Sequence, residues 1–464
     1  MKTIVMKFGG TSVGSPEAIR SLAAIVRAAR DAGDRPAVVV SALSGVTDLL
    51  LGAAHAAADG DAARARETSA TLLERHLRTL RDVAPTAEAI RDLISDSLDQ
   101  FVNLCQAIAV LGEASPRALD AIASLGERMS APLVAAALEA GGIPSMSIST
   151  ADIILTDSHF LNATPDMEAT HERATARIQP VLVGGGVPVL TGFIGADRRG
   201  AITTLGRGGS DYSAAILGVA LAADEVWIWT DVNGVMTTDP RIAPDARTIP
   251  VLTYREISEL AHFGAKVLHP KTIRPVVERG IALWVKNTFE PANPGTRIVL
   301  EDEGWVDGGI RAVTAIKAQC VITLEGRGML GIPGIAARTF AAVARTRTSV
   351  SLISQASSEQ SICFVVPYPA AQTVVAALED EFRRELTGDD LDGVTASDPV
   401  AIITVVGAGM VHTPGVSGRM FSALGNASVN VVAIAQGGSE CGISCVVSAQ
   451  QADDAVRAIH KLIV

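Results

Sequence analysis

The chain begins with MKTIVMKFGGTSVGSPEAIRSLAAIVRAARDAGDRPAVVVSA (residues 1–42), and this stretch sets its architecture. The period of two over residues 3–8 predicts a strand that ends at Gly9. Ser15 predicts the start of a helix, because serine caps helices and the proline that follows it suits the first helical position. The apolar run over residues 36–42 predicts a second, buried strand. Strand, helix and strand in this order are typical of a parallel sheet.

Apolar runs of the same kind recur further along the chain, separated by alanine-rich helical stretches. They lie at residues 187–193, 225–230 and 281–286. This alternation predicts an α/β fold in which helices cover both faces of a mainly parallel sheet. Ligands of such sheets bind at the carboxyl ends of the strands. The turn-rich segment FEPANPG (residues 289–295) predicts that the first domain covers residues 1–295.

The carboxy-terminal part contains an internal repeat with a constant offset of 81 residues. The matching pairs are Gly328/Gly409, Met329/Met410, Pro333/Pro414, Gly334/Gly415, Arg338/Arg419, Phe340/Phe421, Gln355/Gln436 and Glu359/Glu440. Each copy has the pattern of a strand, a GM-x3-PG loop, a helix, two strands and a helix, which indicates two small units packed on each other. We expect the first unit, with a leading strand, over residues 306–396 and the second over residues 397–464.

Composition excludes several classes of protein. With 48% hydrophobic and 19% charged residues, the 464-residue chain is typical of a folded protein, and no apolar run is long enough to predict a membrane span. A net charge of -11 argues against nucleic acid as a partner. Five cysteines without CxxC spacing predict neither a disulfide framework nor a zinc site. The first residues do not form a signal peptide, so we expect a cytoplasmic location.

The motif KFGGTS (Lys7 to Ser12) has the composition of a phosphate site. Gly9 and Gly10 let backbone amides approach an anion, Lys7 adds a fixed positive charge, and Thr11 and Ser12 add hydroxyls. The spacing is not that of a P-loop. The alternative is an ordinary strand-to-helix turn.

The motif LGRGGSD (residues 205–211) combines glycines with charged residues just before a helix. Arg207 can hold a carboxylate with two hydrogen bonds, and Asp211 at the helix start can orient a lysine or a metal-bound phosphate. A flexible tether, the alternative, would not need the charges. TDVNGVMTTDPR (residues 230–241) offers groups suited to a ribose or a base, although a polar hairpin explains it equally well.

Taken together and in order, these motifs resemble those of the aspartate kinases, within the amino-acid kinase superfamily. The motifs are KFGGTS, SALSGVTDLL, LGERMS, LGRGGSDYSAA, WTDVNGVMTTDPR, FGAKVLHP and the duplicated tail, which resembles tandem ACT domains. The resemblance covers essentially the whole chain and is closest to threonine-sensitive members. It implies a three-layer αβα amino-acid kinase fold followed by two ferredoxin-like ACT domains.

The resemblance also implies a reaction. The family transfers the γ-phosphoryl group of ATP to the β-carboxylate of L-aspartate, giving 4-phospho-L-aspartate in the first step of lysine, threonine and methionine biosynthesis. Lys7 and Lys266 would flank the phosphates and Asp211 would hold the lysines in place. Mg2+ would arrive with ATP rather than through direct protein ligands.

The same resemblance assigns binding residues. Aspartate would meet Thr47, Glu127, Arg207 and Ser210. ATP would meet Lys7, Gly9, Gly10, Thr11, Ser12, Thr230, Asp231, Met236, Arg241 and Lys266. The chain departs from the family at Met236, where an aromatic residue is common. Without the resemblance, Glu127 and Lys266 would be taken for ordinary surface charges.

The duplicated tail is expected to regulate the enzyme. In similar kinases the residues at Gln355 and Gln436 contact threonine, so we expect threonine, or alternatively lysine, as an allosteric ligand. The alternative role of the tail is dimerisation alone, and a homodimer or a higher homo-oligomer is expected in either case.

Three other functions remain as alternatives. A kinase for glutamate, acetylglutamate or a nucleotide would use a similar phosphate site but would not predict this combination of motifs. An amino-acid sensor without activity would not need Lys7, Lys266 and Asp211 together. An oxidoreductase is disfavoured because no GxGxxG follows the first strand, and no hydride-transfer module is expected within these residues.

Overall fold

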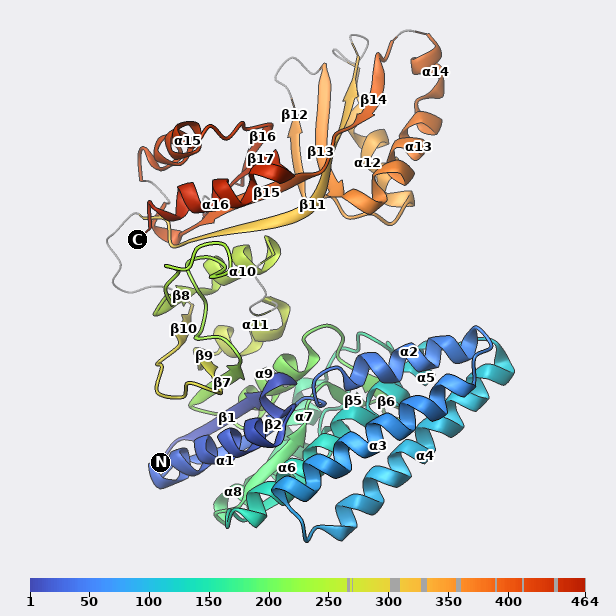
Figure 1. Cartoon of the computed structure of the whole chain (residues 1–464), viewed down its shortest axis with the longest axis vertical. Coiled ribbons are helices and arrows are strands. Elements are labelled where there is room, and N and C mark those ends of the chain that lie inside the picture. Colours follow the sequence, from blue (N-terminus) through green and yellow to red (C-terminus); the bar gives the residue numbers. More distant parts are fainter. Residues whose placement is uncertain are drawn as a thin grey trace. The chain divides into compact units, whose positions relative to one another are not determined.

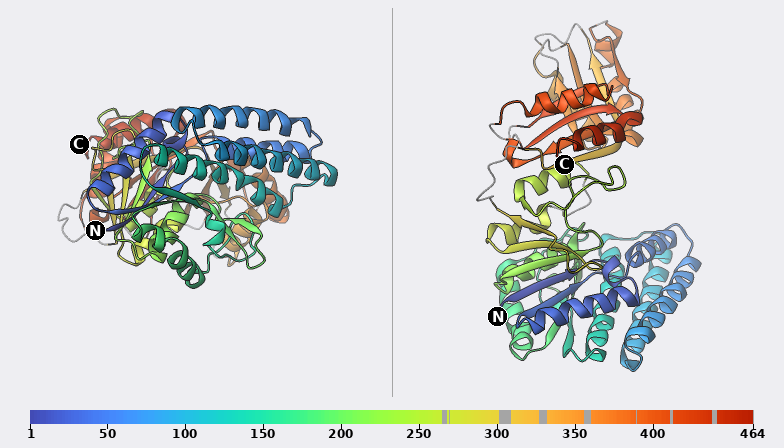
Figure 2. Two further views of the ribbon diagram at one scale, coloured as in Figure 1. Left: turned by 90° about the horizontal axis from the view of Figure 1, so that it is seen from below. Right: turned by 60° about the vertical axis from the view of Figure 1, so that its left-hand side comes forward.

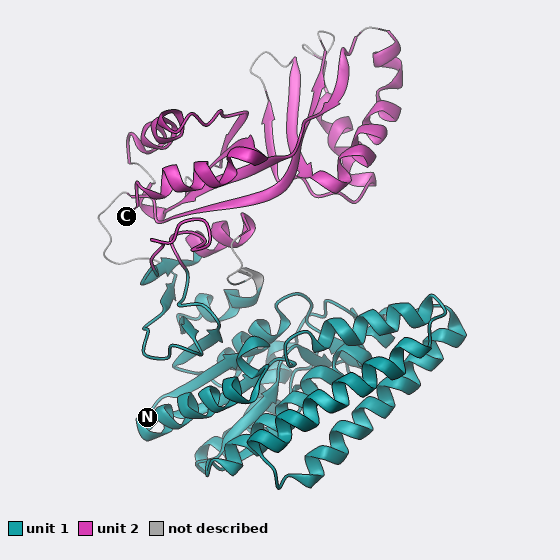
Figure 3. Cartoon of the chain, viewed as in Figure 1, with its two compact units in different colours: residues 1–235, 248–254, 268–302 teal, residues 236–247, 255–267, 303–464 magenta. Residues whose placement is uncertain are grey.

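The structure is a computed structural model that describes residues 1–264, 268, 270–300, 309–326, 332–355, 360–388, 390–410, 413–437 and 441–463. The chain forms two compact units (Figure 3). The first contains residues 1–235, 248–254 and 268–302, and the second contains residues 236–247, 255–267 and 303–464. Two segments from the middle of the chain therefore belong to the second unit. The expected domain boundaries stay predictions.

The first unit is built on an eight-stranded sheet in the order β3-β4-β2-β1-β7-β9-β10-β8. Neighbouring strands are parallel except for the antiparallel pair β9 and β10. The strands are β1 (Thr3–Phe8), β2 (Arg35–Val40), β3 (Ser145–Ile148), β4 (Val187–Thr191), β7 (Glu225–Thr230), β8 (Val251–Thr253), β9 (Ala282–Asn287) and β10 (Thr296–Val299). A separate antiparallel pair consists of β5 (Ile194–Ala196) and β6 (Ile202–Thr204).

Two groups of helices cover this sheet, one on each face (Figures 1 and 2). The first group is α1 (Pro16–Asp31), α2 (Val46–Ala58), α3 (Ala63–Val83), α4 (Glu88–Leu111), α5 (Pro116–Ala123) and α6 (Leu125–Ala140). The second group is α7 (Met167–Arg177), α8 (Gln179–Val183), α9 (Gly209–Ala220) and α11 (Pro270–Glu278). The predicted cap of α1 is present, because the Ala18 amide donates to Ser15 Oγ at 3.2 Å.

The second unit holds a seven-stranded sheet in the order β12-β13-β11-β15-β17-β16, with β14 also paired to β11. Its strands are β11 (Ala312–Glu325), β12 (Leu352–Gln355), β13 (Ser361–Pro367), β14 (Gly393–Ala396), β15 (Val400–Val406), β16 (Ala433–Gln436) and β17 (Gly442–Ser448). The start of β11 pairs with β15 and its end pairs with β13 and β14. The pairing shifts between Ile316 and Gln319, where Ala318 has a φ of 56°.

The predicted repeat is visible in the helices of this unit. We call the two halves the first copy and the second copy. The helices α12 (Ile335–Arg345) and α13 (Ala371–Glu381) of the first copy correspond to α15 (Val416–Asn426) and α16 (Ala452–His460) of the second. Each copy has its own buried core. The remaining helices are α10 (Tyr254–His262) and the short α14 (Arg383–Thr387).

The predicted fold class is confirmed: a mostly parallel sheet between two layers of helices, followed by an antiparallel sheet that carries the repeat. Among the described residues, no helix combines the length and the apolar character needed to cross a bilayer. The expected location in the cell stays a prediction.

Candidate functional site

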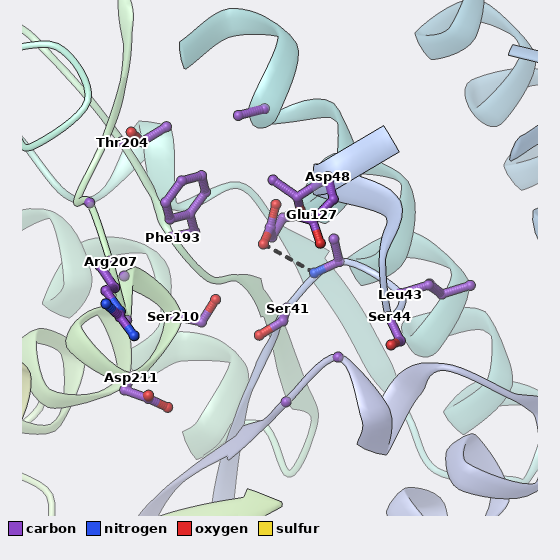
Figure 4. Close-up of a pocket in the computed structure, with 18 of the residues that line it drawn as sticks. Ser41, Leu43, Ser44, Asp48, Glu127, Phe193, Thr204, Arg207, Ser210 and Asp211 are labelled. Atoms are coloured by element: carbon purple, nitrogen blue, oxygen red, sulfur yellow. Dashed lines mark hydrogen bonds between the residues drawn. The ribbon is translucent and has the colours of Figure 1, made fainter. Parts of the chain in front are cut away.

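A pocket of about 750 Å³ opens in the first unit at the carboxyl ends of β1 and β2 (Figure 4). Its walls come from the loops that follow these strands, from α2, from the junction of α5 and α6, and from the start of α9. The pocket therefore lies where the parallel sheet predicts a ligand. Ten residues named from the sequence line it, namely Lys7, Gly9, Gly10, Thr11, Thr47, Glu127, Arg207, Ser210, Asp211 and Thr230.

The glycine turn after β1 is held tightly against the loop after β2. The Ser44 amide donates to the Gly10 carbonyl at 3.2 Å, and the Gly9 amide donates to the Trp229 carbonyl at 3.2 Å. A Cβ on Gly10 would lie 3.1 Å from the Ala42 carbonyl oxygen. Glycine suits this close approach, because a side chain would push the two loops apart by a few tenths of an ångström.

Ser12 is turned away from the pocket. Its fully buried hydroxyl lies 2.6 Å from Thr288 Oγ1, and it donates more weakly to the Trp229 carbonyl at 3.4 Å. Ser12 fixes the base of the turn, whereas Thr11 lies beside the glycines and lines the pocket.

Lys7 and Asp211 form an ion pair across the pocket floor. Lys7 Nζ lies 2.6 Å from Asp211 Oδ1, and the two side chains are 11% and 15% exposed. Lys7 is near the end of β1 and Asp211 is in the first turn of α9, so residues far apart in sequence meet at one charge centre. Lys266, the second lysine predicted for this centre, lies outside the described residues.

Glu127 presents a buried carboxylate to the pocket. Its Oε1 accepts a hydrogen bond from the Ala42 amide at 3.1 Å. Its Oε2 is buried and has no hydrogen-bond partner among the described residues. Burial raises the pKa of Glu127 to about 8, against a smaller opposing effect of the Ala42 hydrogen bond and the Lys7 charge. An unsatisfied buried carboxylate oxygen is the partner that an ammonium group requires.

A small residue brings Glu127 to this position. A Cβ on Gly126 would lie 2.7 Å from the Ala42 Cβ, so only glycine lets the start of α6 approach the loop after β2 so closely. The Thr47 hydroxyl would lie 3.5 Å from the same Cβ and is therefore near Glu127.

Arg207 and Ser210 lie on the opposite wall of the pocket, as Figure 4 shows. Gly206 and Gly208 flank Arg207 with φ angles of 78° and 71°, which L residues rarely adopt. Arg207 is exposed and no ion pair is found for it among the described residues, so its guanidinium is available to a ligand. A Cβ on Gly192 would lie 2.8 Å from the Ser210 Cβ, which shows how closely α9 approaches the end of β4.

Asp120, a buried carboxylate that lines the pocket, was not indicated by any motif of the sequence. Its Oδ2 accepts from the amides of Leu161 at 2.9 Å and Thr204 at 3.0 Å, and its Oδ1 accepts from Thr204 Oγ1 at 2.6 Å. Asp120 thereby ties α5 to the segment that leads into Arg207. An aspartate in an alanine-rich helix gives no local signal of this role.

Phe193 was also missed, because its place at the end of the apolar run over residues 187–193 gives no sign of a pocket residue. It lines the pocket with a φ of 69°, and a Cβ on Gly209 would lie 2.5 Å from its ring. A bulky residue in this conformation is uncommon and marks a constrained position.

The other predicted residues are not among those that line the pocket. Asp231 Oδ1 accepts a hydrogen bond from Thr230 Oγ1 at 3.2 Å. Met236 and Arg241 belong to the second unit, where Arg241 pairs with Asp239 at 2.6 Å. In the second unit, Gln355 and Gln436 are exposed at corresponding ends of β12 and β16, as the repeat predicts.

Family models match most of the chain. The model of the amino acid kinase family matches residues 2–287. The ACT domain model matches twice, over residues 322–382 and 403–462.

One curated relative matches the chain over nearly its whole length. The chain is 35% identical over 471 residues to bifunctional aspartokinase/homoserine dehydrogenase 1, chloroplastic, of Arabidopsis thaliana. The alignment covers 98% of this chain and 50% of the relative. The chain thus spans about half the length of the bifunctional relatives it matches.

Two solved structures of one bacterial enzyme share the whole fold. Aspartokinase III of E. coli, in complex with lysine and aspartate, is 32% identical with a TM-score of 0.82. The same enzyme in complex with aspartate and ADP is 31% identical with a TM-score of 0.79. Both comparisons cover 100% of each chain.

Proposed function

Because the chain belongs to the amino acid kinase family and has the domain composition of an aspartokinase, we propose that it transfers the γ-phosphoryl group of ATP to the β-carboxylate of L-aspartate. One observation carries this proposal. The ion pair of Lys7 and Asp211 beside the glycine turn shares a single pocket with an unsatisfied buried carboxylate oxygen of Glu127. A phosphate site and an ammonium site are thus adjacent.

Four side chains in the pocket suit the amino-acid end of aspartate. The α-ammonium group is bound by Glu127, whose Oε2 gains the partner that it otherwise lacks. The α-carboxylate is bound by Arg207, because a guanidinium matches a carboxylate with two parallel hydrogen bonds. The hydroxyls of Thr47 and Ser210 add hydrogen bonds. The β-carboxylate is then directed to the glycine turn.

The chemical step is mainly electrostatic. The β-carboxylate of aspartate has a pKa near 3.9 and is ionised at neutral pH, so no general base is needed. The residues must bring two anions together and balance charge on the transferred group. Lys7 supplies a positive charge at the glycine turn, and Asp211 fixes the position of its ammonium group. We assign Lys266 to the same task from the resemblance alone.

The nucleotide is assigned to the segment after β7. Thr230 and Asp231 bind the sugar or base. Met236 and Arg241, which follow them in the sequence, complete the nucleotide site. Thr11 and the backbone around Gly10 approach the phosphates. Mg2+ enters with ATP, since this ion is usually bound by substrate phosphates and one or two carboxylates. It supplies charge neutralisation of the phosphates when bound.

We assign a regulatory role to the two ACT domains. Gln355 and Gln436 occupy equivalent, exposed ends of β12 and β16, and each offers an amide donor and an acceptor. We propose threonine as the ligand, acting on a homodimer formed through these domains. Lysine is the alternative effector, since the solved E. coli relative is a complex with lysine. Activity measured across titrations of each amino acid distinguishes them.

The test of the proposed activity is formation of an acyl phosphate. Purified protein with ATP, Mg2+ and hydroxylamine is expected to give a hydroxamate with L-aspartate and none with L-glutamate or N-acetyl-L-glutamate. A hydroxamate with glutamate alone, or ATP hydrolysis without any acyl phosphate, would contradict the proposal.

A further inference from the structure

The segment 236–247 leaves the first unit and returns to it. Its neighbours on both sides are fixed within the first unit: the Val235 amide donates to Thr296 Oγ1 at 2.8 Å, and Thr248 Oγ1 donates to the Asn233 carbonyl at 2.8 Å. The residues between them group with the second unit. We call this segment the nucleotide loop, because it contains Met236 and Arg241.

A buried histidine of the second copy holds the start of this loop. His460, the last residue of α16, is 1% exposed, and its Nε2 lies 2.9 Å from Thr237 Oγ1. Its Nδ1 lies 3.4 Å from Asp245 Oδ1. One imidazole ring therefore contacts both ends of the nucleotide loop.

The Thr237 hydroxyl makes two contacts in this arrangement. The Arg247 amide donates to Thr237 Oγ1 at 3.0 Å, and His460 Nε2 contacts the same oxygen. Either nitrogen of the neutral ring can carry its proton, and Nδ1 faces Asp245. Burial lowers the pKa of His460, which favours this neutral form. Both ring nitrogens therefore face polar atoms of the loop itself.

Further contacts bind the same loop to the second unit. The Val313 amide, in β11, donates to the Thr237 carbonyl at 2.8 Å. Ile242 packs against the core of the second copy, and Arg457 Nη1 donates to the Ile242 carbonyl at 3.5 Å. The loop is thus positioned by α16 and β11, which belong to the regulatory part of the chain.

We propose that His460 is a positioning residue for the nucleotide: through Thr237 it sets the conformation of the loop that carries Met236 and Arg241. The inference rests on the proposed function, because it assigns ATP to this loop. His460 itself does not touch the substrate. Its effect is expected on nucleotide affinity, while the chemistry at Lys7 and Asp211 is left intact.

The test compares nucleotide affinity with turnover in full-length variants. His460→Ala and Thr237→Val each remove the hydrogen bond, and each is expected to raise the KM for ATP and the Kd for ADP, measured by calorimetry, about three- to tenfold. kcat at saturating ATP and the KM for aspartate should stay within about twofold. Thr237→Ser keeps the hydroxyl and should bind ADP like the parent protein.

A matched control separates positioning from general loss of stability. His76 is also a fully buried histidine, bound to the Leu72 carbonyl at 2.7 Å within α3, outside the pocket and the loop. His76→Ala should lower Tm without changing the Kd for ADP. An equal loss of ADP affinity in His76→Ala, or unchanged affinity in both His460→Ala and Thr237→Val, would overturn the inference.

The two proposals fail in different ways. If the parent protein binds ADP and the variants weaken it, but no aspartyl hydroxamate forms, the proposed substrate is wrong and the positioning role stands. If aspartate is phosphorylated and ADP affinity does not respond to either variant, the positioning role is wrong. Absence of ADP binding by the parent protein would overturn both.

Discussion

The two ends of the pocket hold their charges in opposite ways. At the end that we assign to phosphate, the Lys7 ammonium is balanced by Asp211 at 2.6 Å, and both side chains retain some contact with solvent. At the end that we assign to the amino-acid group, Glu127 is buried, and its Oε2 has no hydrogen-bond partner among the described residues. The positive charge of Lys7 is balanced before any ligand arrives, whereas a negative charge on Glu127 becomes favourable only when a cation binds. Substitutions at the two ends should therefore change different kinetic parameters.

The largest effect is expected at the phosphate end. Lys7→Ala removes the described positive charge at the glycine turn and should lower kcat about 100- to 1000-fold, because a lost charge contact in such a site costs ~3 to 4 kcal/mol. Steady-state hydroxamate assays measure this. Lys2→Ala is the matched control, since Lys2 lies next to the same strand and pairs at the surface with Glu225. Turnover near that of the control would remove Lys7 from the mechanism.

At the opposite wall, the loss of Arg207 should act on binding rather than on turnover. Arg207→Ala removes a charged hydrogen-bonding partner worth about 1.5 to 3 kcal/mol, which predicts a KM for aspartate about 10- to 100-fold higher. kcat should change little, because the α-carboxylate is held equally in the ground and transition states. Arg198→Ala, at an exposed arginine that is 83% accessible, serves as the control. An unchanged KM would place the α-carboxylate elsewhere.

If Glu127 binds the α-ammonium group as proposed, the binding of aspartate should depend on pH. With a pKa of about 8, Glu127 is protonated in the empty pocket at neutral pH and must lose its proton to bind an ammonium group. The KM for aspartate should therefore fall as pH rises toward 8, by up to about tenfold per pH unit, and level off above it. Glu127→Gln should bind aspartate weakly with no such dependence. Glu139→Gln, at an exposed position of α6, is the control.

The carboxyl group of Glu127 should also make the free energy of unfolding depend on pH. A carboxyl group whose pKa is raised in the folded state binds more protons there than in the unfolded chain between about pH 4.5 and 8. The free energy of unfolding of the empty protein should thus decrease as pH rises through this window. Saturating aspartate should oppose the decrease, and Glu127→Gln should lack this contribution. A Tm profile of the variant identical to that of the parent would contradict the assignment.

Local signals explain which of these features the sequence could predict. The glycine turn, the cap at Ser15 and the offset of the repeat depend on neighbouring residues or on a regular pattern, and each is found in the structure. Lys7 and Asp211 were placed together by the resemblance, and they do form an ion pair.

The features that were missed depend on partners far along the chain. Asp120 bonds to Leu161 and Thr204, and the Ser12 hydroxyl turns toward Thr288. Likewise, no local pattern indicates that residues 236–247 belong to the second unit. Such roles arise from tertiary packing, which a short stretch of sequence does not indicate.

The smallest effect is expected at Asp120, which holds the segment that leads to Arg207. Asp120→Ala removes the carboxylate oxygen that accepts from the Leu161 and Thr204 amides. Leaving buried amides unsatisfied costs about 1 to 3 kcal/mol, so Tm should fall by several degrees. Because Thr204 leads directly into the glycines around Arg207, the KM for aspartate should also rise a few-fold while kcat and the KM for ATP stay the same. Asp99→Ala, at an exposed position of α4, is the control. A loss of stability without any change in the KM for aspartate would show that Asp120 supports the fold and not the orientation of Arg207.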